Sequence, residues 1–364
     1  MSDLDNVISK AVANKDVPFL VGMVGDARGV VWSGAAGERS PGQPATLDTV
    51  FRIFSMTKAV GSTAAMILID RGKLSADTIV ETILPEFAEL KVLEGFDEKR
   101  PKLRAPRTKA TVRHLATHTS GLVYEFWNTE VPRYMEATGH PTILSGLAVA
   151  LKYPLQFDPG ERWDYGVGID WLGRMVEKVD GRSIDRFCKE EIFDPLKMGD
   201  TRFEVEDHMK ARLAAVKIRG EGGEFGDFDI APPSNPEFYG MGHALDGARI
   251  LSERGLESML ANQIGDIPIP LLKTAVPAIT ADCELFPGKR KSHSMAFMRI
   301  EEDIPGMRNA GSQGWAGVLN THFWLDPKAS LAGLLMTQSL PFVEPRFVDT
   351  YATFERAAYR QVAR

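Results

Sequence analysis

Short apolar runs typical of β-strands lie near both ends of the chain. Residues 17–36 contain two such runs around a Gly- and Asp-containing turn, which predicts a β-hairpin. Residues 295–300, 317–326 and 331–338 have the same character, and the segment Asp326-Pro327-Lys328-Ala329 predicts a hairpin turn between the last two. Strands are therefore expected close to the two termini.

Helical patterns and loops dominate between these ends. Residues 55–71 predict an apolar helix that stops before Gly72, and residues 77–87 predict a second, shorter helix. Residues 112–201 read as helices separated by loops with Pro and Gly, and residues 346–363 predict a closing helix.

This order of elements predicts an α/β (α+β) fold. Strands far apart in sequence can share one antiparallel sheet, with the terminal helices on its faces. We expect residues 1–75 and 290–364 to form a discontinuous sheet lobe, and residues 76–289 to form a mainly helical lobe with loops.

Composition narrows the classes of function. With 364 residues, 44% of them hydrophobic, the chain is long enough for a large core. A formal net charge of -6 gives no basic surface for nucleic acid. There is no apolar run of about 18 residues for a membrane helix and no secretory signal pattern, so a cytoplasmic location is expected. Cys188 and Cys283 are the only cysteines, and they form neither a disulfide framework nor a metal or redox pair.

The segment Ser55-Met56-Thr57-Lys58 is the only Ser-x-x-Lys in the chain. It follows a β-like run over residues 49–54 and opens the predicted helix, where free backbone N–H groups favour negative charge. The Lys three residues on shares the helix face of the Ser, and a Lys in an apolar site can act as a base. The alternative is a Ser that caps the helix beside a solvated Lys.

Two further segments carry candidate chemistry. Tyr165 lies in a Gly-rich turn before a predicted helix, where it is either a partner base for the Lys or a packed aromatic residue. Residues 311–318 are rich in small residues and precede a strong strand. Such a strand edge lets a substrate lie close, so that a backbone N–H there can complete an oxyanion hole with that of Ser55; the alternative is a strand-entry turn.

These motifs, in this order, resemble the serine β-lactamase-like superfamily, and within it the class C-like carboxylesterases called family VIII esterases. The resemblance covers nearly the whole chain, including residues 51–58, 111–122, 157–165, 192–199 and 314–327. It implies the β-lactamase-like fold, Ser55 as nucleophile, and Lys58 with Tyr165 as the proton-handling pair. It also implies the amides of Ser55 and Val318 as the oxyanion hole.

The resemblance further implies a substrate site near Trp315, Ala316 and Gly317. Penicillin-binding relatives usually have Tyr-x-Asn at the second motif and Lys-Thr-Gly or His-Thr-Gly at the third, whereas this chain has Tyr165-Gly166-Val167 and Trp315-Ala316-Gly317. The missing cation and hydroxyl normally hold a β-lactam carboxylate, so the change favours neutral esters. Tyr124 and Trp127, from an aromatic cluster with Phe126, are expected either in the core or in contact with substrate.

Other patterns weigh against rival chemistries. There is no Gly-x-Ser-x-Gly, no phosphate loop and no His-Glu-x-x-His. His114 and His118 have i, i+4 spacing but no acidic third ligand nearby, so we expect a structural role, no metal and no cofactor. Relatives commonly have an extra helix-length stretch near residues 240–247, so the chain is either shortened here or lacks residues.

The sequence therefore predicts a serine carboxylesterase that hydrolyses small neutral esters through a Ser55 acyl-enzyme. A β-lactamase, an amidase or peptidase, and an acyltransferase using the same site remain open alternatives. A non-enzymatic sensor that accepts an acyl group is a more remote one. The expected partner is a small-molecule ester, with neither nucleic acid nor membrane.

Overall fold

The computed structural model describes residues 2–230 and 250–362 of the chain. The expectation about residues 240–247 lies outside these described residues. Within them, no helix is both long and apolar enough to cross a membrane.

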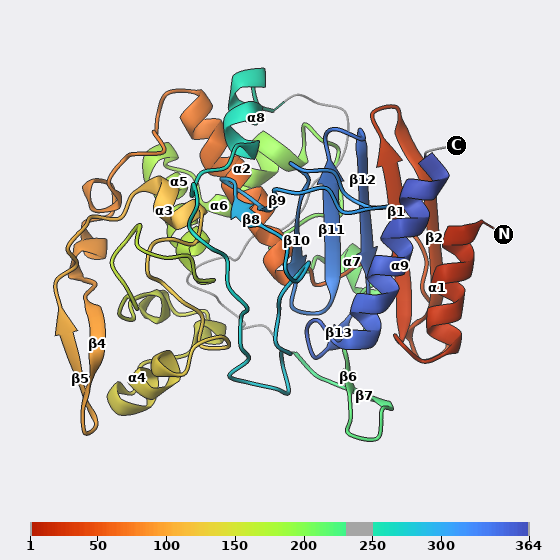
Figure 1. Ribbon diagram of the computed structural model, residues 1–364, viewed down its shortest axis with the longest axis horizontal. Helices are drawn as coiled ribbons and strands as arrows, with labels where there is room; N and C mark the ends of the chain where they lie inside the picture. Colours follow the sequence, from red (N-terminus) through yellow and green to blue (C-terminus); the bar gives the residue numbers. More distant parts are fainter. Residues whose placement is uncertain (1, 231–249, 363–364) are drawn as a thin grey trace.

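An eight-stranded antiparallel sheet, within the described residues, joins the two ends of the chain (Figure 1). In order across the sheet its strands are β3 (Gln43–Pro44), β2 (Gly29–Ser40), β1 (Phe19–Asp26), β12 (Leu331–Met336), β11 (Thr321–Asp326), β10 (Gln313–Gly317), β9 (Met298–Ile300) and β8 (Lys291–His293). The N-terminal hairpin and the C-terminal strands meet where β1 pairs with β12, for example Val21 opposite Met336. The predicted antiparallel sheet from both termini is confirmed.

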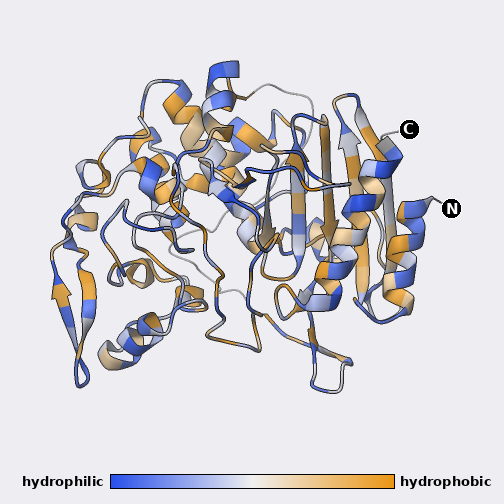
Figure 2. Cartoon of the chain, viewed as in Figure 1, coloured by the Kyte–Doolittle hydropathy of each residue, from blue (hydrophilic) through white to orange (hydrophobic). Residues whose placement is uncertain are grey.

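Two helices cover one face of this sheet. They are α1 (Asp3–Ala13) and α9 (Pro345–Val362), which lie side by side against β1, β2 and β12 (Figure 1). Ser2 caps α1 in a reciprocal capping box with Asp5, which fixes where that helix begins. Both helices mix polar and apolar residues, as expected for helices with one face on a sheet (Figure 2).

The other face of the sheet is covered by helices from the middle of the chain. The central helix is α2 (Thr57–Asp70), which contacts α5 (Gly168–Asp180), α6 (Ile184–Cys188) and α8 (Glu253–Leu260). The other α-helices in the described part of the middle of the chain are α3 (Val112–Ala116), α4 (Glu130–Thr138) and α7 (Asp207–Lys210). Ten of the 14 residues of α2 are buried, so this helix lies inside the protein.

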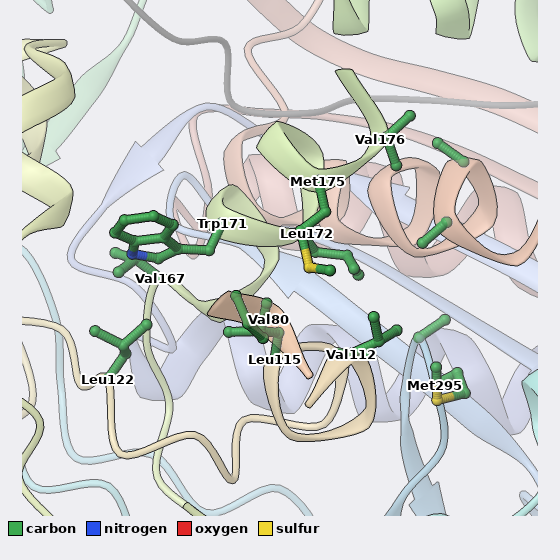
Figure 3. Packing of buried hydrophobic residues seen from close by; sticks show 14 of the residues in the cluster. Val80, Val112, Leu115, Leu122, Val167, Trp171, Leu172, Met175, Val176 and Met295 are labelled. Carbon is green, nitrogen blue, oxygen red and sulfur yellow. The ribbon is translucent and has the colours of Figure 1, made fainter. Parts of the chain in front are cut away.

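The core of this region is continuous from α5 to the sheet. Leu172 and Met175 of α5 point toward Val112 and Leu115 of α3 (Figure 3). Trp171 is fully buried and packs edge-on against Phe87 with ring centroids 4.9 Å apart. Burial of such large side chains stabilises the fold by about 1.5–3 kcal/mol each.

The structure also corrects several boundaries. Residues 77–87 do not form one helix but two short 3₁₀ turns, Val80–Thr82 and Pro85–Glu89, because the chain turns at Leu84 before a Pro. The run over 49–54 makes only an isolated bridge at Val50 rather than a strand.

Two small sheets were not predicted from the sequence. One is the hairpin β4 (Val92–Asp97) and β5 (Arg100–Arg104). The other joins β13 (Ser339–Leu340), β6 (Lys217–Arg219) and β7 (Phe225–Asp227).

A buried ion pair ties α9 to the sheet region. Arg308 donates from Nε to Glu355 Oε1 at 2.8 Å and from Nη2 to Glu355 Oε2 at 3.0 Å, and also to the hydroxyl of Tyr351 at 3.1 Å. Both charged side chains are almost fully buried. Removal of one partner leaves an unpaired charge in the core, which is far more costly than loss of an exposed pair.

We therefore expect Glu355→Ala to lower the free energy of unfolding by about 3–5 kcal/mol. Asp207→Ala, which breaks the exposed pair with Lys210, is the matched control and should leave the unfolding midpoint almost unchanged. Urea denaturation of the two variants checks this. Equal midpoints would contradict the assignment of Arg308 and Glu355 as a structural pair.

Candidate active site

Ser55 lies in a 3₁₀ turn (Phe54–Met56) directly before α2. The sequence placed it as the first residue of the helix; the structure begins the helix two residues later, with Met56 at the N-cap position. Phe54 has φ of +43°, an uncommon conformation for a residue with a side chain. Such backbone strain costs of order 1–3 kcal/mol and persists only where the surroundings hold it.

Lys58 is buried one turn after Ser55 and contacts it directly. Its side chain donates from Nζ to Ser55 Oγ at 3.1 Å and to the hydroxyl of Tyr124 at 3.1 Å. The residue is only 6% exposed. The same Nζ lies 5.1 Å from the ring centroids of both Tyr124 and Tyr165, a distance at which an ammonium is attracted to a ring face.

A close contact between two turns places these tyrosines side by side. The backbone N–H of Tyr124 donates to the carbonyl of Tyr165 at 2.9 Å, and the two ring centroids are 5.1 Å apart. Gly166 makes this approach possible, because a Cβ there would lie 1.9 Å from the carbonyl oxygen of Leu122. No other residue fits at that position without displacing one turn.

The two tyrosines present different groups to Lys58. Tyr124 accepts a hydrogen bond from Nζ through its hydroxyl, whereas Tyr165 offers its ring. Among the described residues, the buried Tyr165 hydroxyl has no hydrogen-bond partner. The sequence paired Lys58 with Tyr165 and placed Tyr124 in the core or the substrate site; the structure gives the direct contact to Tyr124.

Tyr124 contacts Asp170, a residue that the sequence did not single out. Its hydroxyl donates to Oδ2 of Asp170 at 3.5 Å, and Asp170 lies in the first turn of α5. Burial raises the pKa of Tyr124 well above its ordinary value, and the charge of Asp170 raises it further. The only sequence signal was an acidic residue at a helix start, which is common on surfaces.

The end of β10 packs directly on the turn that holds Ser55. A Cβ on Gly317 would lie 2.0 Å from the carbonyl oxygen of Ile53, and Thr321 Oγ1 donates to the same oxygen at 3.4 Å. Trp315 and Ala316 of this strand are buried, and Val318 follows it directly. The predicted third motif therefore ends, at Gly317, in contact with Ile53, which lies two residues before Ser55 in the chain.

Trp315 belongs to an aromatic wall beside Tyr165. The ring centroids of these two residues are 5.1 Å apart, and His118 lies 4.8 Å from Tyr165 and 5.8 Å from Trp315. His293 lies 5.6 Å from Trp315. Burial lowers the pKa of both histidines, that of His293 to about 4, so both are neutral near pH 7.

Neither histidine was assigned to the site from the sequence. His118 was expected to be structural together with His114, and His114 does cap α3 with Thr111. His293 lies in a β-strand and has no motif around it. Among the described residues, no group of three or more His, Cys, Asp or Glu side chains is arranged to hold a metal ion.

Trp127 lies at the edge of this group. Its ring packs edge-on against Phe342 at 6.3 Å, while Phe126 lies 6.0 Å from Tyr124. Trp127 is half-buried. Its contact with substrate therefore stays a prediction.

Together these contacts give a serine hydroxyl, an adjacent buried amine and a buried set of aromatic side chains. A sequence profile described as Beta-lactamase matches residues 4–358. The chain belongs to this family. Two similar proteins are monacolin J acid methylbutanoyltransferase from Aspergillus terreus, 30% identical over 98% of this chain and 95% of its own length, and lovastatin esterase from Penicillium rubens, 29% identical over 98% of both.

Solved structures of the Beta-lactamase family agree. A mutant of simvastatin synthase (LovD) from Aspergillus terreus has a TM-score of 0.84 at 28% identity, covering 99% of this chain and 94% of its own. A family VIII carboxylesterase matches with a TM-score of 0.67 at 17% identity, covering 98% and 96%, and shows the fold alone. The chain is therefore an enzyme of the β-lactamase-like serine hydrolase and acyltransferase group.

The close packing of Gly317 on the carbonyl of Ile53 makes activity sensitive to a side chain at position 317. We expect Gly317→Ala to lower kcat/KM for an ester by about 10²-fold or more, because the added Cβ pushes the end of β10 away from Ile53. Gly199→Ala, at an exposed position with nothing within 4 Å, is the matched control and should keep full activity. Steady-state kinetics and thermal unfolding of both variants check this; a fully active G317A would contradict the close packing.

Proposed function

We propose that this protein transfers acyl groups from small neutral carboxylic esters through an acyl-enzyme on Ser55, with a small-molecule alcohol as the main acceptor and water as the competing one. The observation that carries the proposal is the contact of Lys58 Nζ with Ser55 Oγ at 3.1 Å in a buried setting. A nucleophile and base within hydrogen-bond reach are the signature of covalent acyl transfer.

The proton steps follow from the contacts. Neutral Lys58 accepts the Ser55 proton as Oγ attacks the ester carbonyl, and the amides of Ser55 and Val318 hold the oxyanion. The ester C–O bond then breaks, and the leaving alkoxide takes a proton from Lys58 directly or through the Tyr165 hydroxyl. That hydroxyl is without a partner among the described residues, so it is free to bind the leaving or accepting oxygen.

The aromatic wall supports a neutral substrate. The third motif carries Trp315 and Ala316 where penicillin-binding relatives have a cation and a hydroxyl. The nearby imidazoles of His118 and His293 are uncharged at neutral pH because burial lowers their pKa. A carboxylate next to this wall would therefore lack a charged partner, which disfavours β-lactams.

The relatives favour transfer over simple hydrolysis. Most relatives with a named activity are named as acyl-transferring enzymes, one of them for a methylbutanoyl transfer to monacolin J acid, and one is named as an esterase of lovastatin. At a serine nucleophile, transfer and hydrolysis can pass through one acyl-enzyme and differ only in whether an alcohol or water attacks it. We therefore place the acyltransferase, which the sequence left as the alternative, before the carboxylesterase, and we infer a short branched or unbranched acyl group and an apolar alcohol.

The first prediction from this proposal concerns Ser55. With p-nitrophenyl butyrate, we expect multiple turnovers for the natural chain and a loss of about 10³-fold or more for Ser55→Ala, because the nucleophile is gone. Mass spectrometry of the intact protein should detect a butyryl adduct of the natural chain and none on S55A. Full activity of S55A would overturn the proposal, and a stable adduct without turnover would indicate a sensor.

The second prediction concerns the acceptor. An apolar alcohol added to the same reaction should divert acyl groups from butyric acid to the new ester, because it competes with water for one intermediate. Where deacylation limits turnover, it should also raise the rate of p-nitrophenol release. Unchanged product ratios with alcohol would favour the esterase.

Nitrocefin hydrolysis should be at least about 10²-fold slower than ester turnover, because its carboxylate has no cationic partner. Fast nitrocefin turnover would favour a β-lactamase.

A further inference from the structure

We propose that Asp170 is a positioning residue for acyl transfer: its carboxylate sets the direction of the hydrogen bonds through Tyr124, so that the lone pair of Lys58 remains available to Ser55. This inference rests on the proposed function. Asp170 acts through Tyr124 and does not itself touch the reacting atoms.

The four side chains form one continuous series of contacts. Ser55 Oγ is 3.1 Å from Lys58 Nζ, Nζ is 3.1 Å from the Tyr124 hydroxyl, and that hydroxyl is 3.5 Å from Asp170 Oδ2. They come from the start of α2, the loop after α3 and the first turn of α5. Packing of α5 on α2 therefore decides whether the series is complete.

The direction of each bond follows from the number of hydrogens available. An ionised carboxylate can only accept, and a tyrosine hydroxyl has a single hydrogen. When that hydrogen points to Asp170, Tyr124 presents a lone pair to Lys58 and must accept from it. A neutral amine has two hydrogens and one lone pair; with one hydrogen committed to Tyr124, its lone pair can be aimed at the Ser55 hydroxyl.

Of the two side chains, Tyr124 is the donor and Asp170 the acceptor. Burial raises the pKa of Asp170, and the charge of Lys58, a backbone N–H at the helix start and the Tyr124 hydroxyl offset this only in part. Burial also raises the pKa of Tyr124 and of Tyr153, so both phenols keep their protons. The other titratable groups that act on Tyr124 or Tyr153 are Glu125, Asp164 and Tyr165.

Asp170 lies in the first turn of α5, where a carboxylate is favourable, but no ion pair among the described residues holds it there. Within residues 2–230 and 250–362, none of the ion pairs closer than 4.0 Å includes Asp170, whereas Asp180 at the other end of α5 pairs with Lys73 and Arg182. A partly buried carboxylate without an ion-paired cation is expensive to keep. Its contact with the Tyr124 hydroxyl gives it a function in the site.

Replacement of the Asp170 carboxylate by an amide reverses the direction of the hydrogen bonds that run from position 170 through Tyr124 to Lys58. Asn at position 170 can donate an N–H to the Tyr124 oxygen, which releases the Tyr124 hydrogen to point at the lone pair of Lys58. Lys58 then cannot accept the Ser55 proton until that bond breaks. The proton still travels from Ser55 to Lys58 and then to the leaving alkoxide, and Asp170 neither gains nor loses one.

The experiment compares Asp170→Asn, Tyr124→Phe and the double variant, with Asp180→Asn as the control on the same helix. We expect D170N to lower kcat/KM for p-nitrophenyl butyrate by about 10- to 100-fold with little change in KM. In the Tyr124→Phe background the same substitution should change kcat/KM by less than about twofold, because the two residues act as a unit. D180N should keep the activity of the natural chain.

The pH dependence of kcat/KM distinguishes a positioning role of Asp170 from a loss of activity caused by damage to the fold. Loss of a negative charge near Lys58 should move the ascending limb of kcat/KM to lower pH in D170N, and D180N should not move it. Asp170→Glu, which keeps the carboxylate, should recover part of the activity. Should D170N fail to fold by thermal unfolding, Asp170→Ala provides a second variant. It leaves no side-chain acceptor at position 170, so the Tyr124 hydrogen is again free to point at Lys58 and the same result is expected.

Three results would overturn the inference. They are full activity of D170N, an equal loss when Tyr124 is already Phe, and an unmoved pH profile. If any of these occurs while S55A is inactive, the acyl-enzyme function stands and the role of Asp170 falls. If the natural chain neither turns over nor forms an adduct, the proposed function itself fails, and the two failures are distinguishable.

Discussion

The site depends on how the buried amine of Lys58 is satisfied. An ammonium that is 6% exposed would be costly without partners, and within the described residues no carboxylate lies within 4.0 Å of it. Its partners are instead Ser55, the Tyr124 hydroxyl and two aromatic ring faces. Under the proposed function, these contacts hold the amine of Lys58 beside the Ser55 hydroxyl, whose proton it accepts and then passes to the leaving alkoxide.

Close backbone contacts hold these partners in place. Gly166 lets the turn of Tyr165 approach the carbonyl of Leu122, and Gly317 lets the end of β10 approach the carbonyl of Ile53. Side chains at either position would separate segments that must meet. The strained Phe54 lies between these contacts, so the fold fixes Ser55 in a turn that the local sequence alone would not favour.

The neutral character of the wall distinguishes this site from that of a penicillin-binding protein. Trp315 and Tyr165 provide apolar surface, and the imidazoles beside them are uncharged because burial disfavours their cations. Such a wall suits an ester without a carboxylate.

The sequence by itself determined the family, the sheet built from both termini and the candidate nucleophile. Those features depend on local patterns: short apolar runs within residues 17–36, 317–326 and 331–338, and the short motif from Ser55 to Lys58. The hairpin of β4 and β5 was not predicted from such a pattern. Only the tertiary structure decided that Tyr124 rather than the hydroxyl of Tyr165 bonds Lys58, and that His118, His293 and Asp170 join the site. Those contacts join segments far apart in the chain through packing, and packing leaves no periodic signal in the sequence.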